Sequence, residues 1–178
     1  MSRRPFPWVY PYSEDLVSGT RHVDHRIVLR PVVPITLVGQ DEDHEARVWG
    51  IVDSGAERTL AAPGLARQIG VDPDPNRRIH LGIGGDTRPV RFADVTLRLR
   101  PHEDALPTES VEWQAEVGFI EQWKPPWAVL LGQVGFFDHF TITMSRLTQA
   151  FAIESAEEFE RRFSKEITEA EQALLRRM

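Results

Sequence analysis

The 178-residue sequence predicts the all-β fold class, mainly strands with short helices, followed by an amphipathic helix at its C-terminal end. Two observations indicate strands: β-branched and apolar residues recur in short runs between turn residues, and residues 78–99 alternate on both sides of a glycine-rich tip. A third indicates the helix, because apolar residues follow helical spacing near the end of the chain. The length suits one domain. We therefore expect an extended arm over residues 1–25, a domain over residues 26–153 and a helix over residues 154–178.

The N-terminal arm alternates prolines with the aromatic residues Phe6, Trp8, Tyr10 and Tyr12. Proline disfavours helix and favours an extended backbone. We expect the aromatic side chains to pack on the arm's own domain; contact with a second subunit and a proline-rich ligand for another protein are the alternatives. The arm lacks the apolar segment of a signal peptide and the chain has no cysteine, so we expect a cytoplasmic protein.

An apolar strand over residues 48–52 ends at Asp53, Ser54 and Gly55, after a β-branched run over residues 26–38 that is typical of an edge strand. An ionised Asp beside a core strand is costly unless it is hydrogen-bonded or functional. A glycine also lets backbone N–H groups approach the carboxylate. Asp53 is therefore a candidate catalytic residue. An ordinary turn is the alternative, because Asp-x-Gly is common in turns.

Further elements follow in order. A short helix is expected to begin near Pro63 and end at Gly70, because proline favours the first position of a helix and glycine its end. Residues 78–99 predict a hairpin, and no Lys-Ser/Thr follows its glycines, so it is not a phosphate-binding loop. Residues 111–120 predict a strand with apolar side chains on one face, and residues 128–131 an inner strand.

The C-terminal segment predicts a helix that begins at a capping box formed by Ser155 and Glu158. Its apolar face consists of Phe159, Phe163, Ile167, Ala170 and Leu174. The polar face mixes Glu, Arg and Lys, so we expect a solvated helix docked on the domain. A contact with a second subunit or with a partner helix is the alternative.

Three motifs follow one another along the chain: Asp53-Ser54-Gly55-Ala56, Gly82-Ile83-Gly84-Gly85 and Val129-Leu130-Leu131-Gly132. In this order they resemble the catalytic loop, the flap tip and the apolar segment of retropepsin-like (retroviral-type) aspartic proteases, and the likeness is to a bacterial-type single-domain member. The resemblance implies a closed acid-protease barrel and a short helix over residues 135–140.

The resemblance also implies roles for individual residues. Asp53 would be catalytic, and the active-site loop would be supported by Ser54, Gly55 and Gly132. Substrate would be bound by Ala56, Glu57, Ile83, Gly84 and Gly85. Viral relatives carry an Arg directly after the glycine of the third motif, and it pairs with the acid after the catalytic Ala. This chain keeps the acid as Glu57 but has Gln133, so we expect a neutral hydrogen bond at best in place of that ion pair.

The expected activity is that of an aspartic endopeptidase, which needs two carboxylates that share one proton. This chain supplies one such motif, so the resemblance implies a homodimer in which each subunit contributes Asp53 to the hydrolysis of a peptide or protein substrate. The alternative is a catalytically silent dimer of the same fold that binds peptides or serves assembly. An unrelated all-β domain with coincidental motifs is a third interpretation.

Composition excludes several other classes. Lys and Arg total 21 against 27 Asp and Glu, a formal charge of −6 that argues against nucleic acid as a partner. No apolar stretch reaches the length of a membrane-spanning helix. His22, Asp24 and His25 are residue types that bind zinc, but their spacing is not that of a metal site, and residues 41–45 suit a solvated hairpin tip better than a calcium loop. We therefore expect no metal and no cofactor.

Overall fold

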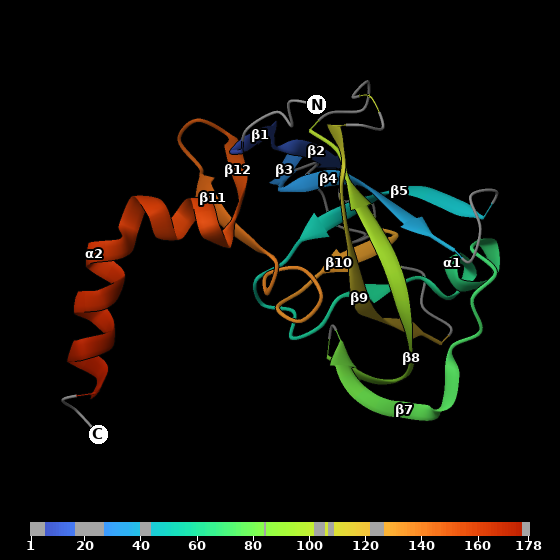
Figure 1. Ribbon diagram of the computed structural model, residues 1–178. Helices are drawn as coiled ribbons and strands as arrows, with labels where there is room; N and C mark the ends of the chain where they lie inside the picture. Colours follow the sequence, from blue (N-terminus) through green and yellow to red (C-terminus); the bar gives the residue numbers. More distant parts are fainter. Residues whose placement is uncertain are drawn as a thin grey trace.

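A ring of strands forms the centre of this protein in the computed structural model, which describes residues 6–16, 27–39, 44–83, 85–101, 106, 109–121 and 127–175 (Figure 1). Within these residues, six strands follow one another around the ring: β4 (Val32–Val38), β5 (Glu45–Val52), β10 (Val129–Leu131), β6 (Leu60–Ala61), β9 (Val111–Ile120) and β8 (Asp86–Leu99). Pairing of β4 with β8 closes it. The predicted fold class, mainly β with a closed barrel and a C-terminal helix, is confirmed.

The barrel core follows from the period-two alternation of its long strands. Along β9, the apolar side chains predicted to share one face are buried: Trp113, Ala115, Val117 and Phe119. On β8 the buried residues include Val95, Leu97 and Leu99, which lie opposite β9 in antiparallel register. The strand β10 pairs in parallel with β5, which ends one residue before Asp53, and antiparallel with β6, which follows the turn.

The predicted hairpin is formed by β7 (Asp74–Ile83) and β8, and Ile83 pairs with Asp86 next to its turn. Within the residues that the structure describes, β7 pairs with β8 alone and is an end strand of its sheet. Its tip curves back toward the barrel in Figure 1. One side of the tip therefore faces the loop that follows β5.

A separate sheet contains the N-terminal β1 (Trp8–Pro11), β12 (Ala150–Ser155) and β11 (Phe140–Ser145), in that order. Trp8 and Tyr10 are buried in it, so these arm residues pack on their own chain. The hydroxyl of Tyr10 donates a hydrogen bond to the carbonyl of Arg100 at 2.5 Å, and burial raises the pKa of Tyr10 above its usual range. Beyond β1, β2 (Ser13–Leu16) pairs with β3 (Ile27–Arg30).

Two helices complete the described chain. The short α1 (Pro63–Gln68) begins at Pro63 and is followed by Gly70 at φ +68°, as predicted. The long α2 (Ala156–Leu175) is capped by Ser155, whose Oγ accepts the N–H of Glu158 at 3.2 Å. In Figure 1, α2 extends away from the barrel, and its main contacts are with β11 and β12. The helix is therefore not docked along its length, contrary to our expectation.

The short helix implied over residues 135–140 is also wrong. This segment forms turns instead, because Gly135 has φ +96° and the carboxylate of Asp138 accepts the Gly135 N–H at 3.1 Å. Such a local side-chain bond competes with helix formation. Within the described residues, no helix combines the length and the apolar character needed to cross a membrane.

Candidate active site

Asp53 lies directly after β5, where the chain leaves the barrel wall. Its N–H donates to the carbonyl of Leu131 at 3.0 Å, which continues the parallel pairing of β5 with β10 by one residue. The N–H of Gly55 donates to Asp53 Oδ1 at 3.0 Å, and the N–H of Ala56 to the Asp53 carbonyl at 3.1 Å. The carboxylate is thereby oriented by its own turn, through one of its two oxygens.

A second loop, which follows β10, is hydrogen-bonded to this turn. The N–H of Gln133 donates to the carbonyl of Ala56, and the N–H of Val134 to that of Glu57, both at 2.9 Å. Gly132 has no room for a side chain, because a Cβ there would lie 2.4 Å from the carbonyl oxygen of Arg58. The close approach of the two loops therefore depends on glycine at this position.

Thr59 joins the loop after β5 to the loop after β10, and sequence reasoning did not identify it. It is fully buried, and its Oγ1 accepts the N–H of Gly132 at 3.2 Å, while its own N–H donates to the carbonyl of Val134 at 2.9 Å. A threonine in a β-rich chain is ordinary, so no local pattern singles it out.

Gln133 does not take the place that we expected. Its Nε2 donates to the carbonyl of Ser54 at 2.8 Å rather than to the carboxylate of Glu57. The cation next to Glu57 is instead its neighbour Arg58, with Nε 4.0 Å from Glu57 Oε1. The amide of Gln133 therefore adds another link between the two loops, and Glu57 remains largely exposed at the rim.

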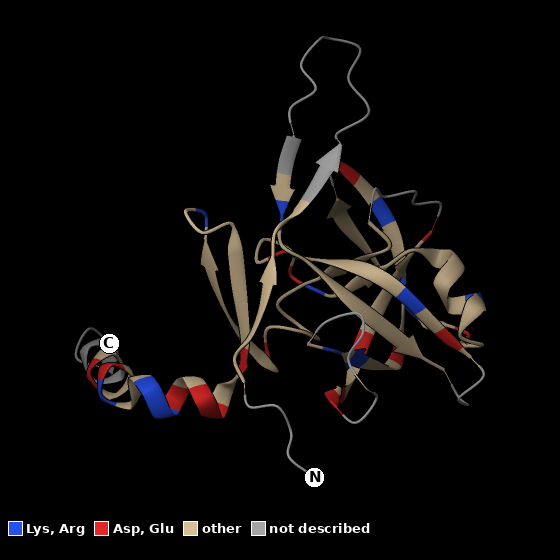
Figure 2. Cartoon of the chain, turned by 90° about the horizontal axis from the view of Figure 1, so that it is seen from above, with Lys and Arg blue, Asp and Glu red and all other residues tan. Residues whose placement is uncertain are grey.

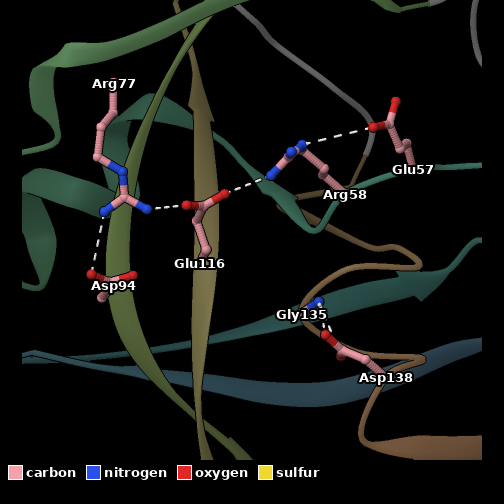
Figure 3. A network of polar contacts seen from close by, with 7 residues as sticks. All are labelled: Glu57, Arg58, Arg77, Asp94, Glu116, Gly135 and Asp138. Atoms are coloured by element: carbon pink, nitrogen blue, oxygen red, sulfur yellow. Dashed lines mark hydrogen bonds and ion pairs between the residues drawn. The ribbon is translucent and has the colours of Figure 1, made fainter.

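Arg58 connects the turn that follows β5 to the barrel through a chain of charges that the sequence did not reveal (Figure 3). Its Nη1 lies 2.6 Å from Glu116 Oε1, and its guanidinium carbon lies 5.2 Å from the ring centroid of Phe92. The second oxygen of Glu116 binds Arg77, which also contacts Asp94 at 3.3 Å. The hydrogen bond to Glu116 has the larger effect and that to Asp94 the smaller, and both raise the pKa of Arg77. Arg58 is therefore held on three sides.

A cavity of about 430 Å³ lies between the turn and the hairpin tip. On one side it is lined by Asp53, Gly55, Ala56, Glu57 and Arg58, and on the other by Leu81, Gly82 and Ile83. Leu60 and Leu130 complete an apolar wall. The cavity thus has two acids, Asp53 and Glu57, on one side and an apolar strand end on the other, at a volume within the range of small-molecule sites.

The structure brings most of the predicted site residues together. Asp53, Gly55, Ala56, Glu57 and Ile83 line the one cavity, whereas Ser54 and Gly132 lie in the loops behind it. Gly85 is in the hairpin turn at φ +89° and does not line the cavity, and Gly84 lies outside the described residues.

Of the residues considered as metal ligands, His22, Asp24 and residues 41–43 also lie outside the described residues. In the described part of the chain, no three His, Asp or Glu side chains gather as a metal site.

Comparison with known proteins found similarity at the level of structure. No protein-family model matches the chain, and no curated protein matches it. It is similar to the crystal structure of the retroviral protease-like domain of Ddi1 from Leishmania major, at 14% identity and a TM-score of 0.42, with 71% of this chain and 93% of that chain covered. It is also similar to a retropepsin-like aspartic protease from Rickettsia conorii, at 10% identity and a TM-score of 0.40, with 68% and 87% covered. Both of these proteins are described as similar to the retroviral-type proteases that the sequence motifs resemble.

Proposed function

We propose that the protein is an aspartic endopeptidase that acts as a homodimer, with Asp53 from each subunit as the catalytic residue. The observation that carries the proposal is the placement of Asp53: the Gly55 N–H holds one carboxylate oxygen, and Asp53 lines a cavity that Ile83 lines from the hairpin. A turn with a purely structural role needs the hydrogen bond but not the cavity. The sequence motifs resemble those of aspartic proteases, and they therefore favour peptide-bond hydrolysis as the reaction at this site.

The need for two subunits follows from the chemistry. Two carboxyl groups about 3 Å apart cannot both ionise, so one stays protonated and can act as an acid while the other acts as a base. Asp53 and Glu57 of one chain both line the cavity, but Glu57 is largely exposed and lies 4.0 Å from Arg58 Nε, so the proposal takes the second carboxyl group from another chain. A two-fold axis beside Asp53 supplies the second carboxyl group from an identical chain.

In the proposed reaction, the ionised Asp53 takes a proton from a water molecule while the water oxygen attacks the peptide carbonyl. The protonated Asp53 of the other subunit gives its proton to the carbonyl oxygen, and a tetrahedral gem-diol forms. Its collapse breaks the C–N bond as the amide nitrogen receives the proton of one carboxyl group, while a gem-diol hydroxyl gives its proton to the other, ionised carboxylate, which leaves one proton on the pair. The products are a carboxylic acid and an amine, and the site is ready for another cycle.

The substrate class is an extended peptide. Among the described strands, β7 lies at the end of its sheet, and its tip borders the cavity. Such an edge can bind a peptide as an added strand, while the apolar wall of Leu60, Leu81, Ile83 and Leu130 takes an apolar side chain. In this proposal the β7–β8 hairpin acts as a flap that moves to admit the substrate.

The deciding experiment is digestion of a mixed peptide library from acidic to neutral pH, read by mass spectrometry, with Asp53→Asn as the paired variant. The amide keeps the shape of the side chain but cannot act as the base, so we expect cuts by the wild type alone. Equal cutting by both proteins would remove Asp53 from the mechanism. Absence of cuts at every pH, from folded dimeric wild type, would favour the silent peptide-binding dimer.

A further inference from the structure

A second cavity, of about 270 Å³, lies on the outer face of the barrel and shares no lining residue with the cavity beside the hairpin tip. Its lining includes Arg47 and Trp49 of β5, Pro34 and Thr36 of β4, and Arg100, which directly follows β8. In the sheet register, Thr36 lies opposite Arg47, and Pro34 lies opposite Trp49. The alternate residues of β4 fill the core, so these side chains lie on the other face of the sheet.

Two glutamates beside this cavity are already engaged by Arg98, which lies opposite Thr36 on β8. Its Nη1 lies 2.5 Å from Glu45 Oε1, and its Nε lies 2.6 Å from Glu112 Oε1. The Arg98 side chain is 15% exposed, so both ion pairs are partly shielded from water. Arg47 shares Glu45 at the longer distance of 3.7 Å. Neither glutamate is therefore free for a further cation.

Arg100 is the cation of this cavity that lacks a counter-charge. Among the described residues, no carboxylate lies within ion-pair distance of it, and its Nε is shielded from solvent without a hydrogen-bond partner. Burial lowers the pKa of Arg100, and so do the charges of Arg47 and Arg98, while Glu45 has the opposite effect. The hydroxyl of Tyr10 holds the Arg100 carbonyl. A shielded guanidinium on a fixed backbone is thus left for an anion from outside the chain.

The charge balance of the cavity limits the anion to a single negative charge. The three arginines outnumber the two glutamates by one, so one positive charge remains. In Figure 2 the barrel strands carry separate blue and red bands and not one large patch of either sign. A chain of phosphates would therefore meet the nearby carboxylates, whereas one carboxylate would not exceed the available charge. The planar fork of a guanidinium also matches the geometry of a carboxylate.

Trp49 gives the same cavity an apolar side. Its side chain is 44% exposed, although it lies on a strand of the barrel. An indole ring can pack against an apolar group that adjoins the carboxylate of a ligand. The volume is smaller than that of a typical small-molecule site, so it suits one side chain or one chain end, and the exposure of Trp49 leaves room for the rest of a peptide.

We propose that the cavity formed by Arg47, Trp49 and Arg100 is a binding site for a peptide carboxylate with an apolar neighbour. Arg100 pairs with the carboxylate, and Trp49 contacts the apolar residue next to it. Two sources share this chemistry, namely an acidic side chain within a peptide and the carboxylate at its C-terminal end. The site requires neither Asp53 nor a second copy of the chain, so it stands apart from the proposed protease activity.

The test measures peptide binding by isothermal titration calorimetry. The probe is the peptide acetyl-Ala-Leu-Glu-Leu-Ala-amide, and its twin contains Gln in place of Glu. A third peptide keeps the Gln but has a free C-terminal carboxylate. All proteins carry Asp53→Asn so that no probe is cut. We expect the Glu peptide to bind about tenfold more tightly than its Gln twin, because a charge-assisted hydrogen bond is lost with the carboxylate.

The matched variants are Arg100→Gln and Arg67→Gln, which remove the same charge from the protein. Arg67 is an exposed residue of α1 and lies outside the cavity. We expect Arg100→Gln to bind the Glu and Gln peptides equally weakly, and Arg67→Gln to keep the tenfold preference. Trp49→Ala should weaken both peptides and keep the preference for Glu. Circular dichroism checks that each variant retains the fold.

The outcomes decide between the proposal and its rivals. Equal affinity of the starting protein for the Glu and Gln peptides, with no binding of the free C-terminal carboxylate, would overturn the site. The same loss of preference in Arg67→Gln as in Arg100→Gln would assign the effect to net charge and also overturn it. Binding of a single-stranded oligonucleotide through Arg100, tighter than that of any peptide, would replace the peptide carboxylate with phosphate. Preference for the free C-terminus over internal Glu would support the site and identify the chain end as its ligand.

Discussion

At the scale of the residue, the site depends on small groups in close contact. One N–H from Gly55 orients the Asp53 carboxylate, and the absence of a side chain at Gly132 lets its backbone approach that of Arg58. Thr59 then fills the space beneath with a buried hydroxyl that accepts the Gly132 N–H. We expect a substitution at Gly55, Gly132 or Thr59 to move the Asp53 carboxylate. The loops after β5 and β10 are joined by backbone hydrogen bonds, so neither loop can shift without breaking them.

Gly132→Ala tests this dependence. The new Cβ would lie 2.4 Å from the Arg58 carbonyl oxygen and 2.8 Å from that of Ala56, so the loops must separate. We expect a loss of about 1–3 kcal/mol in the free energy of unfolding, measured by denaturant titration, together with loss of peptide cutting. The matched control is Gly64→Ala in α1, where a Cβ meets nothing within 4 Å. An equal effect of both substitutions would contradict the close-approach argument.

At the scale of the element, the β7–β8 hairpin has one end in the barrel and the other beside the cavity. β8 contributes buried residues to the core along most of its length, whereas β7 is largely exposed and, among the described strands, pairs with β8 alone. An element that is anchored at one end and solvated at the other can open at low cost. This division suits a hairpin that admits a peptide and then covers it.

Two isoleucines on β7 allow a matched test of that role. Ile83→Ala removes apolar contact from the cavity, and we expect kcat/KM for peptide cutting to fall about tenfold or more, since each buried CH2 is worth about 0.8 kcal/mol. Ile79→Ala changes the same residue type on the same strand, at a position that is 39% exposed and does not line the cavity. It should leave kcat/KM unchanged. Equal losses in the two variants would assign the effect to the strand and not to the cavity.

At the scale of the whole molecule, one barrel provides half of the proposed catalytic pair. The barrel, the sheet of β1, β12 and β11, and the projecting α2 are built so that the Asp53 loop lies at the surface and not at the centre of the chain (Figure 1). Asp53 is only partly buried, and Ser54 and Gly55 are exposed. A surface of this kind can be completed by an identical surface across a two-fold axis.

Mixing of subunits measures whether the site is shared. With the wild-type concentration held constant, an equal amount of Asp53→Asn protein is added and the subunits are allowed to exchange. If both carboxyl groups are needed, random pairing leaves about half of the wild-type subunits in active dimers, and the cutting rate falls to about half. A threefold excess lowers it to about a quarter. An unchanged rate at every ratio would mean that one chain contains the whole site.

Some of the fold and the site could be predicted because the signals are local. Alternation identifies β8 and β9, proline and glycine delimit α1, and Ser155 with Glu158 marks the beginning of α2. The abrupt change from an apolar strand to Asp53 also lies within a few residues. The Thr59 support and the Arg58 network could not be predicted, because Gly132 and Glu116 are 73 and 58 residues away from their partners. No local pattern contains such distances.

By itself, the sequence determined the strand periodicity, the helix ends and the position of Asp53 after an apolar strand, since these depend on neighbouring residues and on backbone preferences. Only the tertiary structure decided that β4 pairs with β8 to close the barrel, that Gln133 binds the Ser54 carbonyl rather than Glu57, and that α2 projects from the sheet. The physical reason is that each of these depends on which distant backbone and side-chain groups reach one another once the chain has folded, and on the space that the packed strands leave between them.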